Sequence, residues 1–388
     1  MDTMSLATEI VTDFAVIMTV AALVTFLFHK LKQPLILGYL IAGMIVGPYT
    51  PPFSLVTRID FLGAAAELGV ILLLFGIGLE FPMARLRMVG RVSMGVAAIE
   101  IAFMLFLSYG VGSVLNWPLM DTLFLGVALA SSSTAIIMKV LGDLEKLREM
   151  PALIMLGVLI VEDLFVVLML PVLQSISVFG RSTLAALGWG LAKAMILVFG
   201  SLAIGRVTVP RIIERIVRIG RGEVLILASL GLCFGLSIVA NRLGFSMAIG
   251  AFLMGVLIAE SESAREVASL VSPLKDVFAA MFFVSIGALM DITQFRNFIA
   301  PGLMITLTMM SAKMLGCGLG TRAFGYDAST SLRVGLGMIQ IGEFAFIVMK
   351  VGEDLGVISP LLFPTIGVVA VITTFLTPYL IKLSYEIG

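Results

Sequence analysis

The sequence predicts an all-α membrane protein with about 13 transmembrane helices. Of its 388 residues, 60% are hydrophobic and 13% are charged, whereas a soluble domain averages about 25% charged residues. A chain of this size could not cover a water-facing surface with so few polar side chains, which excludes a soluble enzyme. The 25 basic and 25 acidic residues balance, so the net charge gives no reason to expect nucleic acid as a partner.

A helix that spans a bilayer needs about 20 mostly apolar residues. Thirteen stretches of the sequence meet this requirement, and each is expected to form one membrane helix. In chain order they are residues 9–28, 34–49, 62–80, 92–115, 119–140, 151–175, 183–205, 223–240, 243–260, 274–290, 298–320, 332–351 and 361–383.

Lys and Arg are distributed unevenly between the segments that connect these helices. The loops after odd-numbered helices, together with the C-terminal end, hold 18 of them, and the loops after even-numbered helices hold 5. Because basic residues favour the cytoplasmic side, we expect a multi-pass protein of the cell (inner) membrane with its N-terminus outside and its C-terminus in the cytoplasm. The Arg-rich segment 206–221 is expected to lie along the membrane surface.

Three short sequence matches recur in the same order at nearly the same offset. The second copy of each match lies in a helix seven places further along the chain. Because seven is an odd number, that helix crosses the membrane in the opposite direction. We therefore predict two inverted six-helix repeats joined by a linker helix at 183–205, an organisation typical of secondary transporters. The matches pair Gly38-Tyr-Leu-Ile-Ala-Gly43 with Gly250-Ala-Phe-Leu-Met-Gly255, Ile77-Gly78 with Ile286-Gly287, and Met138-Lys139-Val140 with Met349-Lys350-Val351, at offsets of 212, 209 and 211.

Two of the predicted helices are interrupted at corresponding points. Hydroxyl side chains in the helix at 119–140 can satisfy backbone groups that unwinding would free, and glycines interrupt the helix at 332–351. Paired interruptions favour a transport site, although polar packing between neighbouring helices is the alternative. The residues concerned are Ser131, Ser132, Ser133 and Thr134 in the first helix, and Gly335, Gly337, Gln340, Gly342 and Glu343 in the second.

Glu162 and Asp163 lie at the centre of the apolar helix at 151–175. Each acid would cost about 2.5–3.5 kcal/mol to insert into a bilayer. Adjacent residues point about 100° apart around a helix, so one acid can face an aqueous cavity while the other pairs with a buried cation. Lys313, in the middle of the helix at 298–320, is the candidate partner. The alternative is a purely structural Glu–Lys pair that fixes helix packing.

Other charges inside predicted helices are weaker candidates. Glu343 lies beside an interruption, where an acid can compensate the positive end of a half-helix. Glu100 is a candidate member of the polar cluster, and Glu67 lies near a helix start, where a carboxylate suits the helix dipole. Asp13 and Asp121 lie near helix ends and are expected to be solvated.

A buried carboxylate surrounded by hydroxyl and backbone carbonyl oxygens can hold either a proton or a small hard cation. Exchange follows if the site must release one to bind the other. Histidine clusters and CxxC metal pairs are excluded, because His29 is the only histidine and the two cysteines, Cys233 and Cys317, are far apart. We expect no cofactor besides the transported Na⁺ or K⁺ and H⁺, and we expect a transporter rather than an enzyme.

Several motifs that extend over nearly the whole chain carry a family resemblance. They are Pro34-Leu-Ile-Leu-Gly38-Tyr-Leu-Ile-Ala-Gly43, Ala66-Glu67-Leu-Gly-Val-Ile-Leu-Leu-Leu-Phe75, Gly78-Leu-Glu80, Ser132-Ser133-Thr134-Ala135-Ile136, Gly250-Ala-Phe-Leu, Phe282-Phe283-Val-Ser-Ile-Gly287 and Gly342-Glu343-Phe344-Ala345-Phe346. With them the sequence resembles the membrane domain of the monovalent cation:proton antiporter superfamily, particularly its Kef-type potassium-efflux branch.

This resemblance implies a homodimer that exchanges K⁺ or Na⁺ for protons by an elevator-like alternating-access mechanism, with a role in pH homeostasis. The dimerisation part would comprise about 9–80 and 223–290, and the core transport part about 92–175 and 298–383, with the two broken helices crossing in it. Asp163 would bind proton and metal cation alternately. Lys313 falls where electrogenic sodium/proton members carry a lysine that pairs with the first acid of their motif, here Glu162.

The sequence departs from this family pattern in two places. Kef-type proteins usually have Gln-Asp where this chain has Glu162-Asp163, and electrogenic sodium exchangers have Asp-Asp, so the ion and the stoichiometry stay open. Kef-type chains also continue into a cytoplasmic nucleotide-binding regulatory domain, so either such a domain or subunit is a partner outside this chain or this regulation is absent. Membrane lipid is the other expected partner.

Two other classes of function fit the sequence less well. A ligand-gated K⁺ efflux channel would need a continuous pore and rings of ligands, which this chain could supply only through oligomerisation. An intramembrane protease would use two acids on separate helices, whereas Glu162 and Asp163 are adjacent on one.

Overall fold

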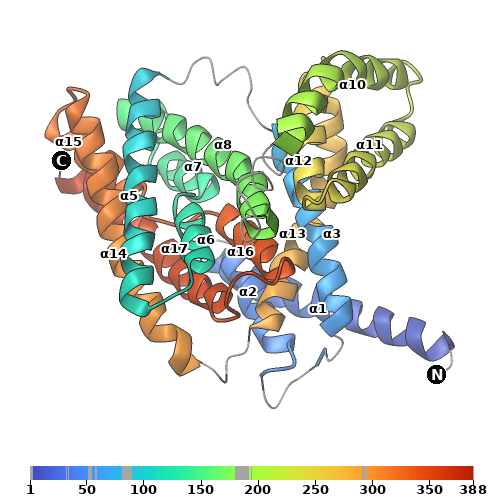
Figure 1. The fold of residues 1–388 in the computed structure, drawn as a ribbon, viewed down its shortest axis with the longest axis horizontal. Coiled ribbons are helices and arrows are strands. Elements are labelled where there is room, and N and C mark those ends of the chain that lie inside the picture. Colours follow the sequence, from blue (N-terminus) through green and yellow to red (C-terminus); the bar gives the residue numbers. More distant parts are fainter. Residues whose placement is uncertain are drawn as a thin grey trace. The chain divides into compact units, whose positions relative to one another are not determined.

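The computed structural model describes residues 3–31, 33, 35–50, 55–56, 59–80, 90–179, 192–193, 195–290, 293 and 295–387. Within these ranges all regular secondary structure is helical (Figure 1), which confirms the predicted fold class. The chain divides into two compact units. One comprises Met1–Met83 and Ala185–Gln294, and the other Ala84–Leu184 and Phe295–Gly388. Each unit therefore combines a segment from each half of the chain.

The first unit is built around α3, which packs against both α12 and α13. Helix α13 also packs against α2, and α12 packs against α11 and α10. Most apolar residues of α3 are buried, including Leu74 and Phe75, so this helix is the core of the unit. The helices are α1 (Thr3–Lys30), α2 (Leu35–Val46), α3 (Ile59–Glu80), a π-helical turn (Ile196–Gly200), α10 (Ser201–Val217), α11 (Gly222–Arg242), α12 (Met247–Ala259) and α13 (Ala264–Leu289).

Glycines allow two close helix crossings in this unit. A Cβ atom on Gly43 of α2 would meet the backbone of α13 around Val284, and one on Gly255 of α12 would meet the backbone of α3 around Phe75. Such contact between backbones is typical of small residues at membrane helix interfaces. The two six-residue motifs that match in the sequence thus make equivalent crossings, although the inverted repeat itself stays a prediction.

Each of the thirteen predicted ranges overlaps a helix in the described residues, but the number of membrane crossings stays a prediction. Ten helical stretches among the described residues are long and apolar enough to cross a membrane. Helices α2 and α12 have 12 and 13 residues, which at 1.5 Å per residue corresponds to roughly 20 Å. That is shorter than the hydrocarbon core of about 30 Å. The predicted range 183–205 lies partly outside the described residues.

Two helix boundaries differ from the prediction by ten residues or more. Helix α13 begins at Ala264 instead of near residue 274, and α10 continues to Val217 instead of ending near residue 205. The added turns contain charged residues such as Glu266 and Arg211. A boundary drawn from apolar content misses amphipathic turns of this kind. The Arg-rich segment is therefore largely the second half of a helix, and its position along a membrane surface stays a prediction.

The second unit is built around α14, which packs against α5, α15 and α17. Helices α5 and α14 lie side by side (Figure 1), and α8 packs against α5 and α15. The helices are α5 (Arg91–Leu115), α6 (Leu119–Leu129), α7 (Thr134–Asp143), α8 (Met150–Phe179), α14 (Phe295–Ala323), α15 (Ala328–Gly337), α16 (Phe344–Asp354) and α17 (Leu362–Ile387).

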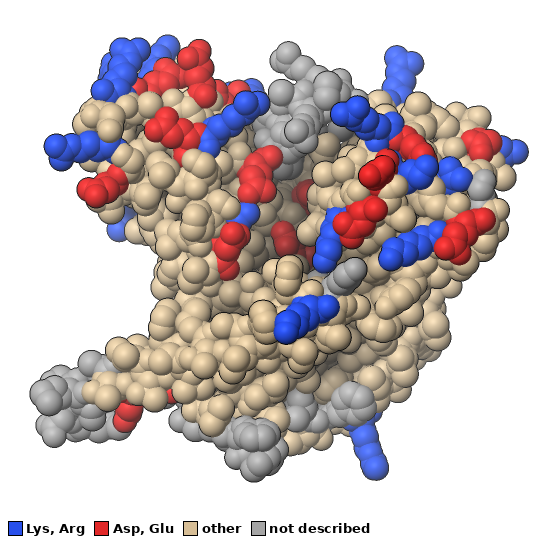
Figure 2. All heavy atoms as spheres, turned by 180° about the vertical axis from the view of Figure 1, so that it is seen from behind, with Lys and Arg blue, Asp and Glu red and all other residues tan. Residues whose placement is uncertain are grey.

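Large apolar side chains are exposed on helices of both units. Phe106 on α5 is 78% exposed, and Val11 on α1 is 68% exposed. Figure 2 shows broad areas of the surface that carry no Lys, Arg, Asp or Glu. Exposed apolar surface of this extent is typical of contact with lipid or with another subunit, which agrees with a multi-pass membrane protein.

The close crossing of α12 and α3 predicts a stability difference between two Gly→Ala variants of the first unit. Gly255→Ala should destabilise the protein by about 1–3 kcal/mol, because the added methyl group overlaps the Phe75 carbonyl. Gly235→Ala on α11 meets open space and should leave stability unchanged or slightly raised. Thermal unfolding of the detergent-solubilised protein measures both, and an equal loss in the two variants would contradict the close crossing.

Candidate functional site

Both predicted helix interruptions are present in the second unit. Helix α6 ends at Leu129 and α7 begins at Thr134, and in the other pair α15 ends at Gly337 and α16 begins at Phe344. In the first interruption Ser133 caps α7, because its Oγ accepts a hydrogen bond from the backbone N–H of Ile136 at 3.4 Å. The hydroxyl run therefore satisfies part of the backbone that the interruption frees, as the sequence predicts.

The two interruptions contact each other directly. The backbone N–H of Gly342 donates a hydrogen bond to the carbonyl oxygen of Ser131 at 3.0 Å. A Cβ atom on Gly342 would lie only 2.6 Å from the carbonyl oxygen of Ser132, so the approach requires glycine. Next to it, the backbone N–H of Ile341 donates to Thr373 Oγ1 of α17 at 3.4 Å. Backbone groups freed in one broken helix thus find partners in the other and in α17.

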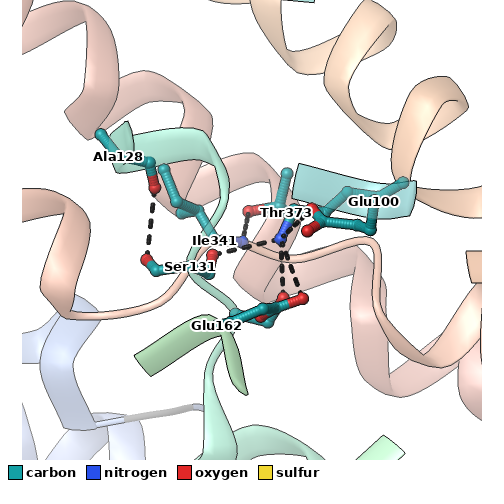
Figure 3. Close-up of polar contacts among 8 residues, drawn as sticks. Glu100, Ala128, Ser131, Glu162, Ile341 and Thr373 are labelled. Carbon is teal, nitrogen blue, oxygen red and sulfur yellow. Dashed lines mark hydrogen bonds and ion pairs between the residues drawn. The ribbon is translucent and has the colours of Figure 1, made fainter. Parts of the chain in front are cut away.

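Lys313 of α14 is fully buried beside this contact. Its Nζ donates to Ser132 Oγ at 2.7 Å and to the carbonyl oxygen of Ser131 at 3.3 Å. The same nitrogen lies 3.2 Å from Glu100 Oε1 and 4.0 Å from Glu162 Oε1. Figure 3 shows the carboxylates of Glu100 and Glu162 pointing toward one nitrogen between them. One ammonium group therefore joins α14, α5, α8 and the first interruption.

The order of these distances adds a nearer carboxylate to the ion pair that the sequence predicts. The predicted Glu162–Lys313 pair is present only at the limit of ion-pair distance, and Glu100, which was a weaker candidate, is the nearer carboxylate. Spacing along the chain cannot reveal this, because Glu100 reaches the lysine through the packing of α5 on α14.

The acidic oxygens around Lys313 are poorly satisfied. Glu100 and Glu162 are both fully buried, and none of their four carboxylate oxygens has a hydrogen-bond partner among the described residues. Asp163 is half-buried, and its Oδ1 is likewise buried without a donor in the described part of the chain. The charges of Glu162 and Glu343 both act on Asp163. Buried oxygens in this state favour the binding of a proton or a cation.

The remaining predicted site residues differ in position. Ser132 and Ser133 are buried in the first interruption, whereas Thr134 is exposed at the first position of α7. Glu343 is half-buried directly before α16. Glu67 is exposed on α3 of the first unit, whereas the buried cluster is formed entirely by residues of the second unit.

Two residues of the cluster region were not predicted as site residues. Gln340 is fully buried in the second interruption, and neither of its amide atoms has a hydrogen-bond partner among the described residues. Its place in the interruption was visible in the sequence and could have indicated it. Thr373, which binds the backbone of Ile341, gave no signal, because a single threonine in an apolar helix is common.

The expectation that Asp13 and Asp121 are solvated is wrong. Both side chains are buried, and Asp121 Oδ1 accepts a hydrogen bond from the backbone N–H of Ser359 at 2.8 Å. In this way Asp121 holds the loop between α16 and α17. A position near a helix end did not imply contact with water, because the neighbouring loop covers it.

The fold and the cluster define a multi-pass membrane protein in which two broken helices meet beside buried charges. The chain belongs to the sodium/hydrogen exchanger family, since the family described as "Sodium/hydrogen exchanger, transmembrane" matches residues 16–382. The family resemblance seen in the sequence motifs is therefore confirmed.

Proteins similar to this chain include named antiporters. It is 33% identical to YbaL of Escherichia coli, over 91% of this chain and 64% of that one, so it spans about two thirds of the length of this relative. It is 30% identical to the Na(+)/H(+)-K(+) antiporter GerN of Bacillus cereus, over 92% of this chain and 91% of that one. The structure of the sodium proton antiporter MjNhaP1 from Methanocaldococcus jannaschii superposes with a TM-score of 0.73 at 19% identity, over 98% and 99% of the two chains. This last similarity shows a shared fold.

The contact between the two interruptions predicts a strong effect of a methyl group at Gly342. Gly342→Ala should push the second interruption away from the Ser132 carbonyl, break the hydrogen bond to Ser131 and lower the melting temperature by several degrees. The matched control is Gly110→Ala on α5 of the same unit, where an added Cβ meets open space. Thermal unfolding in detergent measures both variants, and a Gly342→Ala protein as stable as the control would show that the contact is dispensable.

Proposed function

We propose that this protein is a secondary-active antiporter that exchanges a monovalent cation, Na⁺ or K⁺, for protons, and that Asp163 binds the two alternately. The observation that carries the proposal is the buried Oδ1 of Asp163, which has no donor among the described residues and adjoins the cluster at the helix interruptions. Membership of the sodium/hydrogen exchanger family supports the proposal, and so does the similarity to GerN, whose name includes Na⁺, K⁺ and H⁺.

The chemistry of exchange follows from competition at one carboxylate. A buried carboxylate is costly when it is ionised and alone, so it binds either a proton or a cation. Hard alkali cations favour oxygen ligands, and the interruptions expose hydroxyl and carbonyl oxygens such as those of Ser132 and Ser133 next to the acids. Because both ligands use the same carboxylate, loading of one requires release of the other, and this requirement couples their fluxes.

The division into two compact units supports an elevator-like mechanism as part of this proposal. The unit with the buried cluster, covering about 92–175 and 298–383, would carry the ion across the membrane. The other unit, covering about 9–80 and 223–290, would form the homodimer, with the segment at 183–205 as linker. The N-terminus would lie outside the inner membrane and the C-terminus in the cytoplasm. A nucleotide-binding regulatory domain or subunit remains a predicted partner.

The proposal predicts that Asp163→Asn abolishes exchange. In proteoliposomes with an imposed pH gradient, adding Na⁺ or K⁺ should dissipate the gradient. The variant should fall to the level of protein-free vesicles, because a neutral amide carries no exchangeable proton and no charge to compensate a cation. Asp143→Asn makes the same substitution at an exposed position at the end of α7 and should retain exchange. If Asp163→Asn folds and still exchanges, the site is wrong.

If the protein were an ion channel, the same vesicles should give a different outcome. A channel passes K⁺ down its gradient without proton counterflow, whereas an antiporter in sealed vesicles moves protons outward whenever it moves cations inward. Measuring cation uptake by isotope and proton flux by a pH dye in one preparation separates the two. We expect proton flux to follow cation flux for whichever of Na⁺ and K⁺ is the substrate. Cation uptake that leaves the internal pH unchanged would favour the channel.

A further inference from the structure

The ammonium group of Lys313 makes two hydrogen bonds, to Ser131 and Ser132, and its nearest carboxylate is that of Glu100. A lysine ammonium has three N–H donors. Three oxygens lie within 3.3 Å of Nζ, namely Ser132 Oγ, the carbonyl oxygen of Ser131 and Glu100 Oε1. Glu162 Oε1 comes fourth at 4.0 Å, which is beyond hydrogen-bond distance.

We infer that Glu100, and not Glu162, is the counter-ion that holds Lys313 at the helix interruption. Glu100 is then a positioning residue, and Glu162 is left as a second exchangeable carboxylate beside Asp163. This inference rests on the proposed exchange function for its consequence in transport, while the pairing itself is a property of the folded protein.

The packing of α5 on α14 explains why Glu100 is the nearer acid. A Cβ atom on Gly316 would lie 3.3 Å from the Cα of Glu100, and one on Gly320 would lie 3.4 Å from the Cα of Val96. Two glycines one turn apart on α14 therefore let the backbone of α5 come close. Gly316 is three residues from Lys313, so the close approach occurs on the same turn of helix that carries the lysine.

The charge balance of the cluster gives this pairing a consequence. Glu100 and Glu162 are both fully buried, and one lysine cannot neutralise two carboxylates. If Lys313 stays with Glu100, Glu162 is uncompensated whenever it is ionised, and Asp163 adds a further negative charge next to it. Buried unpaired charges are strongly unfavourable, so Glu162 and Asp163 both hold a proton or share a cation. Lys313 then keeps its own proton throughout the cycle.

The groups around Lys313 limit which residues can be its counter-ion. The titratable groups beside it are Glu100 from α5, Glu162 from α8 and Cys317 from one turn further along α14. The interruption contributes the neutral groups of Ser131 and Ser132. The charge of Lys313 also acts on Asp163, but among the described residues only the two glutamates lie within ion-pair distance of Nζ, so a direct comparison of the two decides the assignment.

Paired substitutions test the assignment through stability. Removing one partner of a buried ion pair is costlier than replacing both by neutral groups. Glu100→Gln and Lys313→Met should each lower the melting temperature by about 5 °C or more, and the double variant should recover more than half of the sum of the two losses. The matched double variant Glu162→Gln with Lys313→Met should show no such recovery. The inference would be overturned if the melting temperature recovered only in the Glu162→Gln, Lys313→Met double variant, or to the same extent in both double variants.

A transport measurement separates a positioning role from a merely structural one. The logarithm of the apparent KM for the cation should rise as the pH falls, and more steeply in the unmodified protein than in Glu162→Gln. In the unmodified protein two carboxylates bind protons in competition with the cation, whereas in the variant only Asp163 does. The Glu100→Gln, Lys313→Met double variant should keep the steep dependence, and Glu100→Asp should retain the stability that Glu100→Gln loses. A flattened slope in that double variant, with no change in Glu162→Gln, would make Lys313 the proton carrier and contradict the inference.

The two measurements also separate failure of this inference from failure of the proposed function. The melting temperatures of the paired variants do not depend on transport, so they decide which glutamate holds Lys313 even if the protein exchanges no cation for protons. Absence of exchange in the unmodified protein would refute the antiport function and the role of Glu162 as a carrier. It would leave the Glu100–Lys313 pairing to be judged on the melting temperatures.

Discussion

The carbonyl oxygen of Ser131 accepts two hydrogen bonds, one from the backbone N–H of Gly342 and one from the ammonium group of Lys313. Backbone inside a membrane can leave the helical conformation only where the freed N–H and C=O groups find partners within the protein. Here the two interruptions supply partners to each other, and a lysine from a third helix supplies another. This one oxygen directly links the two breaks and ties both of them to α14.

The same arrangement explains why so many charges are tolerated in a buried region. The lysine that stabilises the interruption needs a counter-ion, and the close packing of α5 on α14 provides Glu100. The cluster then contains more acid than base, since Glu162 and Asp163 lie nearby with buried oxygens that lack donors among the described residues. An excess of buried carboxylate is unfavourable for a purely structural cluster. For a site that must bind protons and cations in turn, that excess provides the binding capacity.

Much of this fold could be predicted because its signals are local. Apolar stretches of sufficient length identified the helices, and hydroxyl and glycine residues within two of them identified the interruptions. Glu162, Asp163 and Lys313 were recognisable because a charge within an apolar run has a high cost. The errors have the same origin. Apolar content placed the ends of α10 and α13 too far inward, and position near a helix end suggested that Asp13 and Asp121 were solvated when both are buried.

The sequence by itself determined that this is a membrane protein, which helices are interrupted and which charged residues lie within helices, since each of these properties depends on neighbours along the chain. Only the tertiary structure decided that Glu100 lies nearer to Lys313 than Glu162 does, that Gln340 is fully buried and that Thr134 is exposed. These outcomes depend on which faces of α5, α8 and α14 meet. That choice is made by the packing of glycines such as Gly316 against a helix more than 200 positions away in the sequence.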